Sequence, residues 1–253
     1  MSDKILYQKQ AEFPIGIITF NRPERLNALD IEAMTAFAHQ IATLADEPLA
    51  ALIITGAGDK AFCSGGDLAD LAAHRAAEDA EAMITLMGDA LIALENLPYP
   101  VSAAFNGYAL GGCSEISLAC DLRVLDASAR LGFGQAKRGL TPGWGAGQRL
   151  LRLAGYSRAF DLLLNATILS AENALALGLA NRLAPIGEAL LVALELAKQI
   201  AALDPTVIRS LKTLLRAGLT QSYEQALQTE RALFPALWTG ATHQRSLDEF
   251  LNR

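Results

Sequence analysis

Residues 101–147 read VSAAFNGYALGGCSEISLACDLRVLDASARLGFGQAKRGLTPGWGAG, and this stretch decides the fold. An apolar strand passes through the glycine pair Gly111 and Gly112 into a short apolar helix. Two adjacent glycines let the backbone turn sharply and let another group approach the main chain closely. Free N–H groups at the start of such a helix point outward, and Glu115 follows one turn later. Amide donors and one acid beside a glycine turn are the outline of a site for a developing oxyanion.

A second glycine turn lies earlier in the chain, in the segment Cys63-Ser-Gly-Gly-Asp67. This turn also follows a predicted buried strand. Two such turns can bring two backbone N–H donors together around one carbonyl oxygen, and each donor is worth about 3–4 kcal/mol on the transition state. The alternative is that the glycines serve only tight turns, and spacing alone does not separate the two interpretations.

Hydrophobic periodicity predicts mixed strands and helices up to about residue 147 and helices after it. The predicted buried strands are 15–20, 49–55 and 101–105, and the predicted C-terminal helices are 188–203, 205–217 and 222–238. Gly218 is a predicted C-terminal cap, and Ser222 begins a capping box. We therefore expect one α/β core over residues 1–195 and a helical region over residues 196–253. Because such an apolar extension packs on something, we expect an oligomer.

The composition limits the classes of partner. The net charge of −6 and the pI of about 5.1 disfavour nucleic acid, because phosphate binding requires a basic surface. No apolar run reaches the roughly 18 residues that a membrane span needs, and the first ten residues lack an apolar signal core. We therefore expect a cytoplasmic protein without a membrane partner. The three cysteines are predicted to be reduced thiols in the core, and no Cys/His cluster suggests a metal site.

Four segments, in their order and spacing, resemble the crotonase superfamily, also called the enoyl-CoA hydratase/isomerase family. They are Asn21-Arg-Pro with Leu26-Asn-Ala-Leu29, Phe62-Cys-Ser-Gly-Gly-Asp-Leu68, residues 107–121, and Gly139-Leu-Thr-Pro-Gly143 running to Arg149-Leu150. The resemblance implies a spiral of repeated ββα units and a helical C-terminal region that drives assembly into homotrimers, often paired into hexamers. It also implies an acyl-CoA substrate whose thioester oxygen accepts hydrogen bonds from two backbone amides, which fall on Gly66 and Gly112.

The resemblance further implies where the CoA moiety of the substrate binds, and no other cofactor is expected. The residues that match positions lining the CoA site are Arg25, Ala28, Ala61, Ser64, Gly66 and Leu68. Phe250 and Arg253 match a C-terminal aromatic and basic pair that, in the family, often reaches the CoA of a neighbouring subunit. The candidates for the acyl pocket are Asp70, Tyr108, Pro142, Gly143 and Trp144. For Tyr108 and Trp144, plain core packing is the alternative.

Glu115 occupies the first catalytic glutamate position of the family, and we expect it to act as acid and base. The second glutamate of the family lies seven residues before the proline of its PGxG turn, and counting back from Pro142 places Gln135 there. An amide orients water or substrate by hydrogen bonds but exchanges no proton near neutral pH. The chain therefore departs from the two-glutamate pattern of a hydratase.

Three functions fit this equipment. The first expectation is an enzyme of the enoyl-CoA hydratase/isomerase type, acting in fatty acid metabolism, with Glu115 as acid and base and Gln135 as an orienting group. The alternative is a decarboxylase of a methylmalonyl- or ethylmalonyl-CoA-type substrate, because the segment Pro142-Gly-Trp144-Gly is similar to the ethylmalonyl-CoA decarboxylase branch. A hypothesis from another class is a non-catalytic acyl-CoA-binding protein, which would keep the amides and need no acid.

Overall fold

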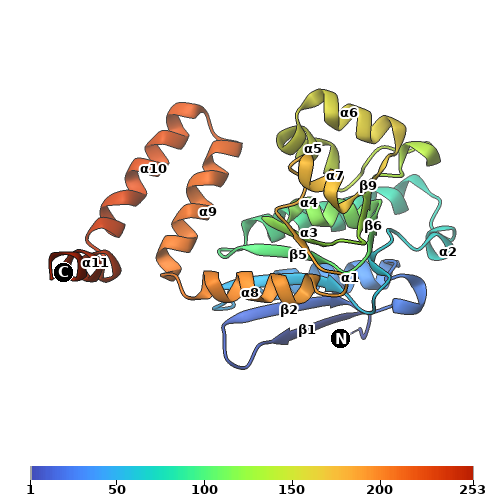
Figure 1. The fold of residues 1–253 in the computed structure, drawn as a ribbon. Coiled ribbons are helices and arrows are strands. Elements are labelled where there is room, and N and C mark those ends of the chain that lie inside the picture. The colour runs from blue at the N-terminus through green and yellow to red at the C-terminus, as the bar shows by residue number, and fades with distance from the viewer. Residues whose placement is uncertain (1, 253) are drawn as a thin grey trace.

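The computed structural model describes residues 2–252, which form two sheets covered by helices (Figure 1). The larger sheet has six strands in the order β1 (Ile5–Lys9), β2 (Ile15–Phe20), β3 (Ala51–Gly56), β5 (Val101–Phe105), β7 (Leu122–Asp126) and β10 (Arg182–Ala184). The smaller sheet has four strands in the order β4 (Ala61–Cys63), β6 (Tyr108–Leu110), β8 (Arg130–Gly132) and β9 (Ile168–Ser170). The pairs β1–β2 and β8–β9 are antiparallel, and the other pairs are parallel.

Helices connect the strands and form the C-terminal third of the chain. The α-helices are α1 (Ile31–Thr43), α2 (Leu68–Leu71), α3 (Ala77–Asn96), α4 (Gly112–Ala119), α5 (Ala146–Ala154), α6 (Tyr156–Asn165), α7 (Ala171–Ala176), α8 (Ala189–Ala201), α9 (Pro205–Thr220), α10 (Tyr223–Trp238) and α11 (Ala241–Leu251). Two short 3-10 turns, η1 (Pro23–Arg25) and η2 (Ala136–Arg138), lie in loops. No helix among residues 2–252 has the length and apolar character that crossing a membrane requires.

The chain alternates regularly between the two sheets. β3, β5 and β7 join the larger sheet, and the strand that follows each of them, β4, β6 or β8, joins the smaller sheet. Helices α2 and α3 after β4, and α4 after β6, return the chain to the larger sheet. This repeat of two strands and a helix confirms the predicted spiral of ββα units.

The central strands of the larger sheet are buried on both faces, as is typical of parallel strands with helices on each side. Ile17 and Ile53 lie opposite each other in the register of β2 and β3 and belong to the apolar cluster that includes α8. Ile18 and Ile54, the next pair, belong to the cluster that includes α1 and α3. Helices therefore pack on both faces of the sheet, and the loops begin at strand ends that this packing fixes.

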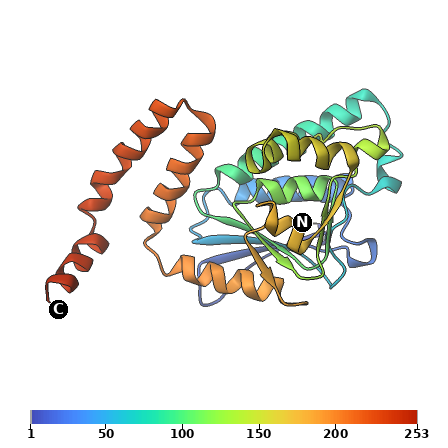
Figure 2. The same cartoon turned by 45° about the horizontal axis from the view of Figure 1, so that its top comes forward.

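Helices α9, α10 and α11 project from the rest of the molecule (Figures 1 and 2). The preceding helix, α8, packs against the larger sheet through Ala193 and Ala197. The predicted division between residues 195 and 196 therefore falls inside α8, and the projecting helices begin at Pro205.

The C-terminal helices lie close to their predicted ranges, and the capping box of Ser222 with Gln225 is present. The predicted cap at Gly218 is wrong, because helical hydrogen bonding continues past it: the amide of Gln221 donates to the carbonyl of Ala217 at 2.9 Å. The expectation of helices alone after residue 147 is also wrong, since β9 and β10 interrupt them. Each of these strands has three residues, which is too short to show a period of two.

Candidate active site

Two glycine turns leave the smaller sheet side by side. β4 and β6 pair in parallel with Cys63 opposite Ala109, so the turns that follow both strands lie at the same edge. Gly65 and Gly111 both have positive φ, 110° and 56°, a region that glycine enters without steric cost. A Cβ on Gly65 would stand only 3.1 Å from the carbonyl oxygen of Leu110. The close approach of the two turns therefore depends on glycine.

The prediction that all three cysteines are reduced thiols is wrong for two of them. Cys63 at the end of β4 and Cys113 in the first turn of α4 form a disulfide, with their Cα atoms 5.5 Å apart. The pair flanks both glycine turns, which the parallel pairing of β4 and β6 brings together across 50 residues of sequence. Cys120 is a free, buried thiol, and burial raises its pKa to about 12.

The amides of Gly66 and Gly112 make no hydrogen bond to the backbone within residues 2–252. Gly112 is the first residue of α4, where a backbone N–H has no acceptor in a preceding turn. Around Gly66 the hydrogen bonds are made by its neighbours: Leu29 donates to the Gly65 carbonyl at 2.9 Å and accepts from the Asp67 amide at 2.8 Å. Both predicted oxyanion donors are therefore available to a ligand.

Trp144 covers one side of Gly112. The residue is 6% exposed and belongs to the main apolar core, and a Cβ on Gly112 would overlap its ring. Core packing and a place beside the candidate site thus both hold for Trp144. Tyr108 on β6 is 47% exposed, which makes core packing wrong for this residue.

Glu115 lies one turn after Gly112 on α4, and its side chain is buried, with 2% of the residue exposed. Its Oε2 atom accepts hydrogen bonds from the backbone amides of Trp144, at 2.8 Å, and Ala146, at 3.0 Å. Its Oε1 atom accepts a hydrogen bond from Nε2 of Gln135 at 2.9 Å. A carboxylate offers about four acceptor positions. Oε1 therefore keeps one lone pair for a proton of water or substrate.

The environment of Glu115 shifts its acidity. Burial raises the pKa of the Glu115 carboxyl, while the amides of Ala146 and Trp144, the Gln135 side chain and the Gly143 backbone lower it. Burial has the larger effect, so the pKa lies above the ordinary value of a glutamate. Perturbed acids of this kind are common in catalytic sites.

Gln135 precedes η2, and its side chain contacts Glu115 directly. Its amide nitrogen binds Glu115, and its buried Oε1 has no hydrogen-bond partner among residues 2–252. A buried carbonyl without a donor is unfavourable. This oxygen is therefore available to orient a water molecule or a donor on the substrate.

The residues predicted to line the CoA site lie on two adjoining segments, one from η1 to Ala28 and the other from β4 to the start of α2. The amide of Ser64, after β4, donates to the carbonyl of Leu26 at 3.0 Å. Arg22, which lies in the matched Asn21-Arg-Pro segment but was not among the predicted CoA residues, joins the same segments through an ion pair with Asp67 of 3.0 Å and a hydrogen bond of 2.6 Å to the Ala28 carbonyl. Of the remaining predicted residues, Ala61 is buried, and Arg25 and Leu68 are exposed.

The other predicted site residues lie on several separate elements and loops. The Asp70 carboxylate accepts a hydrogen bond from the amide of Ile31, the first residue of α1, at 3.0 Å, and Asp67 caps α2. Pro142 and Gly143 lie in the turn before Trp144 and are half-buried. Phe250 is 74% exposed on α11, which lies at the end of the molecule opposite α2 in Figure 1. Arg253 lies outside the described residues.

Two features of the site were missed from the sequence. The first is the pair of hydrogen bonds that the backbone amides of Trp144 and Ala146 donate to Glu115, because no side-chain type encodes a backbone donor. The sequence signal for this turn is Gly145, which lies between the two donors and has a φ of 101°. The second is Arg149, which donates to the carbonyl of Trp144 at 2.6 Å from inside α5. Its place in the matched Arg149-Leu150 segment was visible, but its contact was not.

The sequence model of the enoyl-CoA hydratase/isomerase family matches residues 10–253. This chain belongs to that family. Among its relatives, the short-chain-enoyl-CoA hydratase of Clostridium acetobutylicum is 30% identical over 253 residues, covering 99% of this chain and 95% of that protein. The ethylmalonyl-CoA decarboxylase of Xenopus laevis is 34% identical over 236 residues, covering 92% of this chain and 79% of that protein. The crystal structure of an enoyl-CoA hydratase from Bacillus anthracis superposes with a TM-score of 0.92 at 31% identity, covering 99% of this chain and 96% of that one.

Proposed function

We propose that this enoyl-CoA hydratase/isomerase family member acts on an enoyl-CoA thioester and stabilises an enolate between the amides of Gly66 and Gly112. The observation that carries the proposal is the buried carboxylate of Glu115, one helical turn from Gly112 and held by two backbone amides. A pair of available amides beside a buried acid with a raised pKa is suited to charge that develops on a carbonyl oxygen.

In hydration, Glu115 takes a proton from water while the water oxygen bonds to the β carbon of the enoyl group. The thioester oxygen then carries the negative charge between the two amides. Glu115 returns the proton to the α carbon, which completes the addition of one water molecule. Gln135 holds the carboxylate through Nε2, and its unpartnered Oε1 is suited to orienting the water. In isomerisation the same carboxylate moves one proton along the acyl chain.

Decarboxylation of a methylmalonyl- or ethylmalonyl-type CoA is the second candidate. It is favoured by Gln135, since cleavage of the carbon–carbon bond requires no second acid. Carbon dioxide leaves, the electron pair of the broken bond becomes the enolate, and Glu115 in its protonated form protonates the α carbon. The raised pKa of Glu115 favours that protonated form. The ethylmalonyl-CoA decarboxylase of Xenopus laevis, at 34% identity, supports this candidate.

Incubation with crotonyl-CoA, a 3-enoyl-CoA, methylmalonyl-CoA and ethylmalonyl-CoA tests the two candidates. Loss of enoyl absorbance measures hydration, and release of carbon dioxide measures decarboxylation. We expect turnover of the enoyl substrates; turnover of the malonyl substrates alone would replace the first candidate by the second. The variant Gln135→Glu sharpens the test, because it supplies the missing acid and is expected to increase hydration. A carboxylate at that position would repel a malonyl carboxylate and slow decarboxylation.

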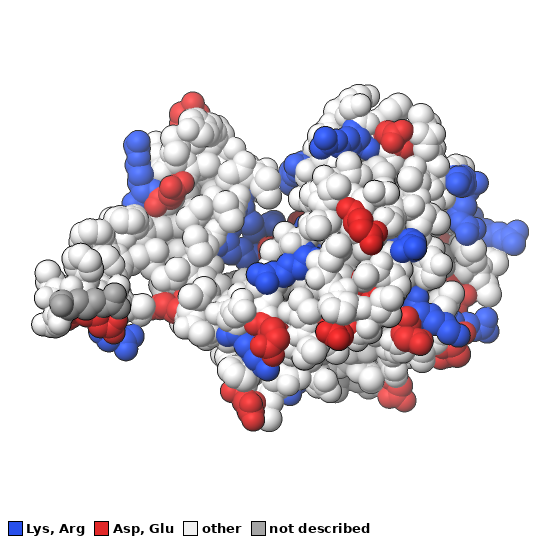
Figure 3. Space-filling view, in the orientation of Figure 1, with Lys and Arg blue, Asp and Glu red and all other residues white. Residues whose placement is uncertain are grey.

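A homotrimer or a homohexamer is proposed for the assembly. The support is the large amount of apolar side chain that α9, α10 and α11 leave exposed. Charged side chains are sparse on the face of this part that Figure 3 shows. The exposed residues are Leu211, Leu215, Leu219, Tyr223, Phe234, Trp238, Leu247, Phe250 and Leu251. Sedimentation of the purified protein at several concentrations tests the proposal, and a single monomeric species would reject it. A cytoplasmic location stays a prediction.

A further inference from the structure

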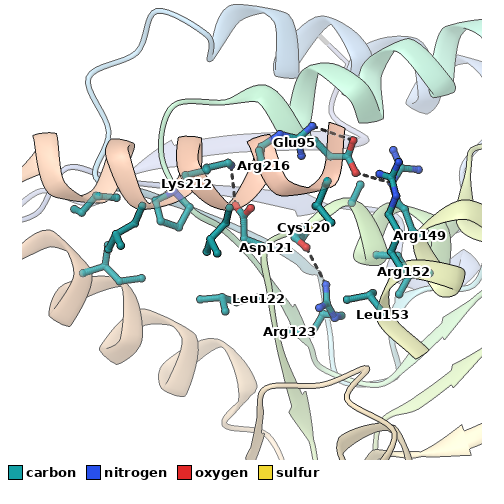
Figure 4. A pocket seen from close by; sticks show the side chains of 18 of the residues that line it. Glu95, Cys120, Asp121, Leu122, Arg123, Arg149, Arg152, Leu153, Lys212 and Arg216 are labelled. Carbon is teal, nitrogen blue, oxygen red and sulfur yellow. Dashed lines mark hydrogen bonds and ion pairs between the residues drawn. The ribbon is translucent and has the colours of Figure 1, made fainter. Parts of the chain in front are cut away.

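A groove of about 430 Å³ separates α9 from the core and is lined by both charged and apolar side chains. Figure 3 shows Lys and Arg side chains inside the hollow between the projecting helices and the rest of the molecule. Figure 4 shows the residues that line this groove. Among them is Arg149, a 9% exposed residue whose guanidinium contacts both helix α3 and the turn that precedes α5. Its Nε donates to Oε1 of Glu95 on α3 at 2.8 Å, and its Nη1 donates to the carbonyl of Trp144 at 2.6 Å.

The turn that Arg149 holds is the same turn that holds Glu115. Within residue 144 the carbonyl accepts from Arg149, while the amide donates to Oε2 of Glu115 at 2.8 Å. Between the two donors to Glu115 lies Gly145, whose absent Cβ would stand 2.6 Å from Nη1 of Arg149. Side chains on a helix point back toward its N-terminus, so Arg149 reaches the turn that begins α5. The guanidinium thus supports the turn on the side opposite the carboxylate.

The same guanidinium is linked to the projecting helices. Glu95 uses its other oxygen, Oε2, to pair with Arg216 of α9 at 3.6 Å (Figure 4). A second pair fixes α9 nearby, because Lys212 binds Oδ2 of Asp121 at 2.8 Å. Contacts therefore run without a break from Arg216 through Glu95 and Arg149 to the turn that carries the donors to Glu115.

We propose that Arg149 is a positioning residue, which fixes the Trp144–Ala146 turn around the Glu115 carboxylate and connects this turn through Glu95 to helix α9. In this role Arg149 acts through the turn and touches neither substrate nor the reacting atoms. The consequence for catalysis rests on the proposed function, in which Glu115 exchanges protons with the acyl group.

The expected effect on Glu115 has a definite sign. No charged side chain within residues 2–252 contacts the carboxylate: it faces the amides of Trp144 and Ala146, the Gly143 backbone and the amide of Gln135. The hydrogen bonds from these groups lower the pKa that burial raises. If the turn loosens, that lowering is lost, and the midpoint of the Glu115 titration moves to higher pH.

The test uses the full-length protein in a Trp238→Phe background, labelled with 15N-tryptophan, so that Trp144 supplies the observed backbone amide signal. Because this amide donates to Glu115, its chemical shift follows the ionisation of the carboxyl, and Glu115→Gln must abolish the titration. We expect Arg149→Gln to raise the midpoint by about one pH unit, a tenfold change in the ionisation constant. Arg152→Gln is the matched control, since Arg152 lies on the same helix and lines the same groove without contacting the turn.

The variant Glu95→Gln separates positioning from simple charge and replaces Arg149→Gln if that variant does not fold. Removing a negative charge lowers the pKa of a nearby carboxyl through space. Loosening of Arg149 instead raises the pKa of Glu115. A titration midpoint of Glu115 that moves to higher pH in the Glu95→Gln variant therefore supports the proposal, and a midpoint that moves to lower pH or stays in place overturns it. An unchanged midpoint in Arg149→Gln, or an equal shift in Arg152→Gln, also overturns it.

Turnover supplies a second reading. On crotonyl-CoA, kcat of Arg149→Gln is expected to fall about tenfold with a nearly unchanged KM, as for the loss of an interaction that serves the transition state. If the parent protein turns over none of the acyl-CoA panel, the proposed function fails. The Trp144 titration still decides the role of Arg149 in that case.

Discussion

The substitution Glu115→Gln removes the acid and retains the shape of the side chain. In the variant, the remaining carbonyl oxygen can accept the amides of Trp144 and Ala146, while the new NH₂ group faces Gln135. Rotation of the Gln135 amide then presents its oxygen, which has no partner in the parent, to that NH₂ group. The hydrogen bonds are thereby preserved, and we expect the free energy of unfolding to change by no more than about 1 kcal/mol.

The effect on catalysis is expected to be large. Proton transfer by a positioned side chain contributes about 10²–10⁴-fold to a rate, so turnover of crotonyl-CoA should fall by that factor. The affinity for the unreactive analogue butyryl-CoA, measured by calorimetry, should hold, because the CoA loops and the oxyanion amides are unchanged. The companion variant Glu115→Ala leaves two buried amides unsatisfied and should cost about 2–6 kcal/mol of stability, at about 1–3 kcal/mol for each.

The assay is steady-state loss of enoyl absorbance, with chemical denaturation of each variant as the stability measurement. If turnover of the Glu115→Gln protein stays within about threefold of the parent, Glu115 is removed from the mechanism. Proton transfer by this side chain should contribute about 10²-fold or more to the rate. A fall in turnover accompanied by an equal fall in butyryl-CoA affinity would point to a binding role. Either result refutes proton transfer as the contribution of Glu115.

Three further predictions concern the same site. Because burial raises the pKa of Glu115, this carboxyl keeps its proton to higher pH in the folded state than in the unfolded chain. The free energy of unfolding should therefore fall as the pH rises from the unfolded pKa of Glu115 to its raised folded pKa. Chemical denaturation at a series of pH values should show this fall in stability in the parent and not in Glu115→Gln. The pKa read from the acid limb of the kcat/KM profile should lie above the ordinary glutamate pKa of about 4.3. Gly112→Ala should cost about 1–3 kcal/mol, because its methyl overlaps the Trp144 ring, whereas Gly66→Ala should cost less, because it meets only a flexible leucine end; equal losses would contradict this difference in packing. Thiol titration should find one reactive thiol, Cys120, in the unfolded chain and three after reduction; three without reduction would reject the disulfide.

Much of the fold could be predicted because its buried strands and helices repeat clear patterns. Ile15–Phe20 and Val101–Phe105 each contain a single polar residue among mostly apolar ones, and both appear as strands at the predicted positions. The short strands of the smaller sheet could not be predicted from period, and the parallel pairing of β4 with β6 joins segments far apart in the sequence. The disulfide between Cys63 and Cys113 was missed for the same reason.

For the site, the sequence indicated the side chains and missed the main chain. Glu115 and Gln135 were recognisable by type and position, and the structure brings them within 2.9 Å of each other. The acyl-pocket prediction for Asp70 stays untested, although its carboxylate accepts the amide of Ile31 at the start of α1. A backbone amide carries no residue-specific signal, so the two donors to Oε2 of Glu115 appear only when the turn after Pro142 is seen in space.

This use of main-chain donors has a consequence for redesign. Every amino acid except proline supplies an N–H, so a substitution at the partly site-facing position 144 retains the backbone donor to the carboxylate, whereas Ala146 is fully buried in the core and is best left unchanged. The side chain at 144 borders Gly112 and therefore also shapes the wall nearest the proposed thioester oxygen. Selectivity for new acyl groups can thus be sought at that position by directed evolution, separately from the group that moves the proton.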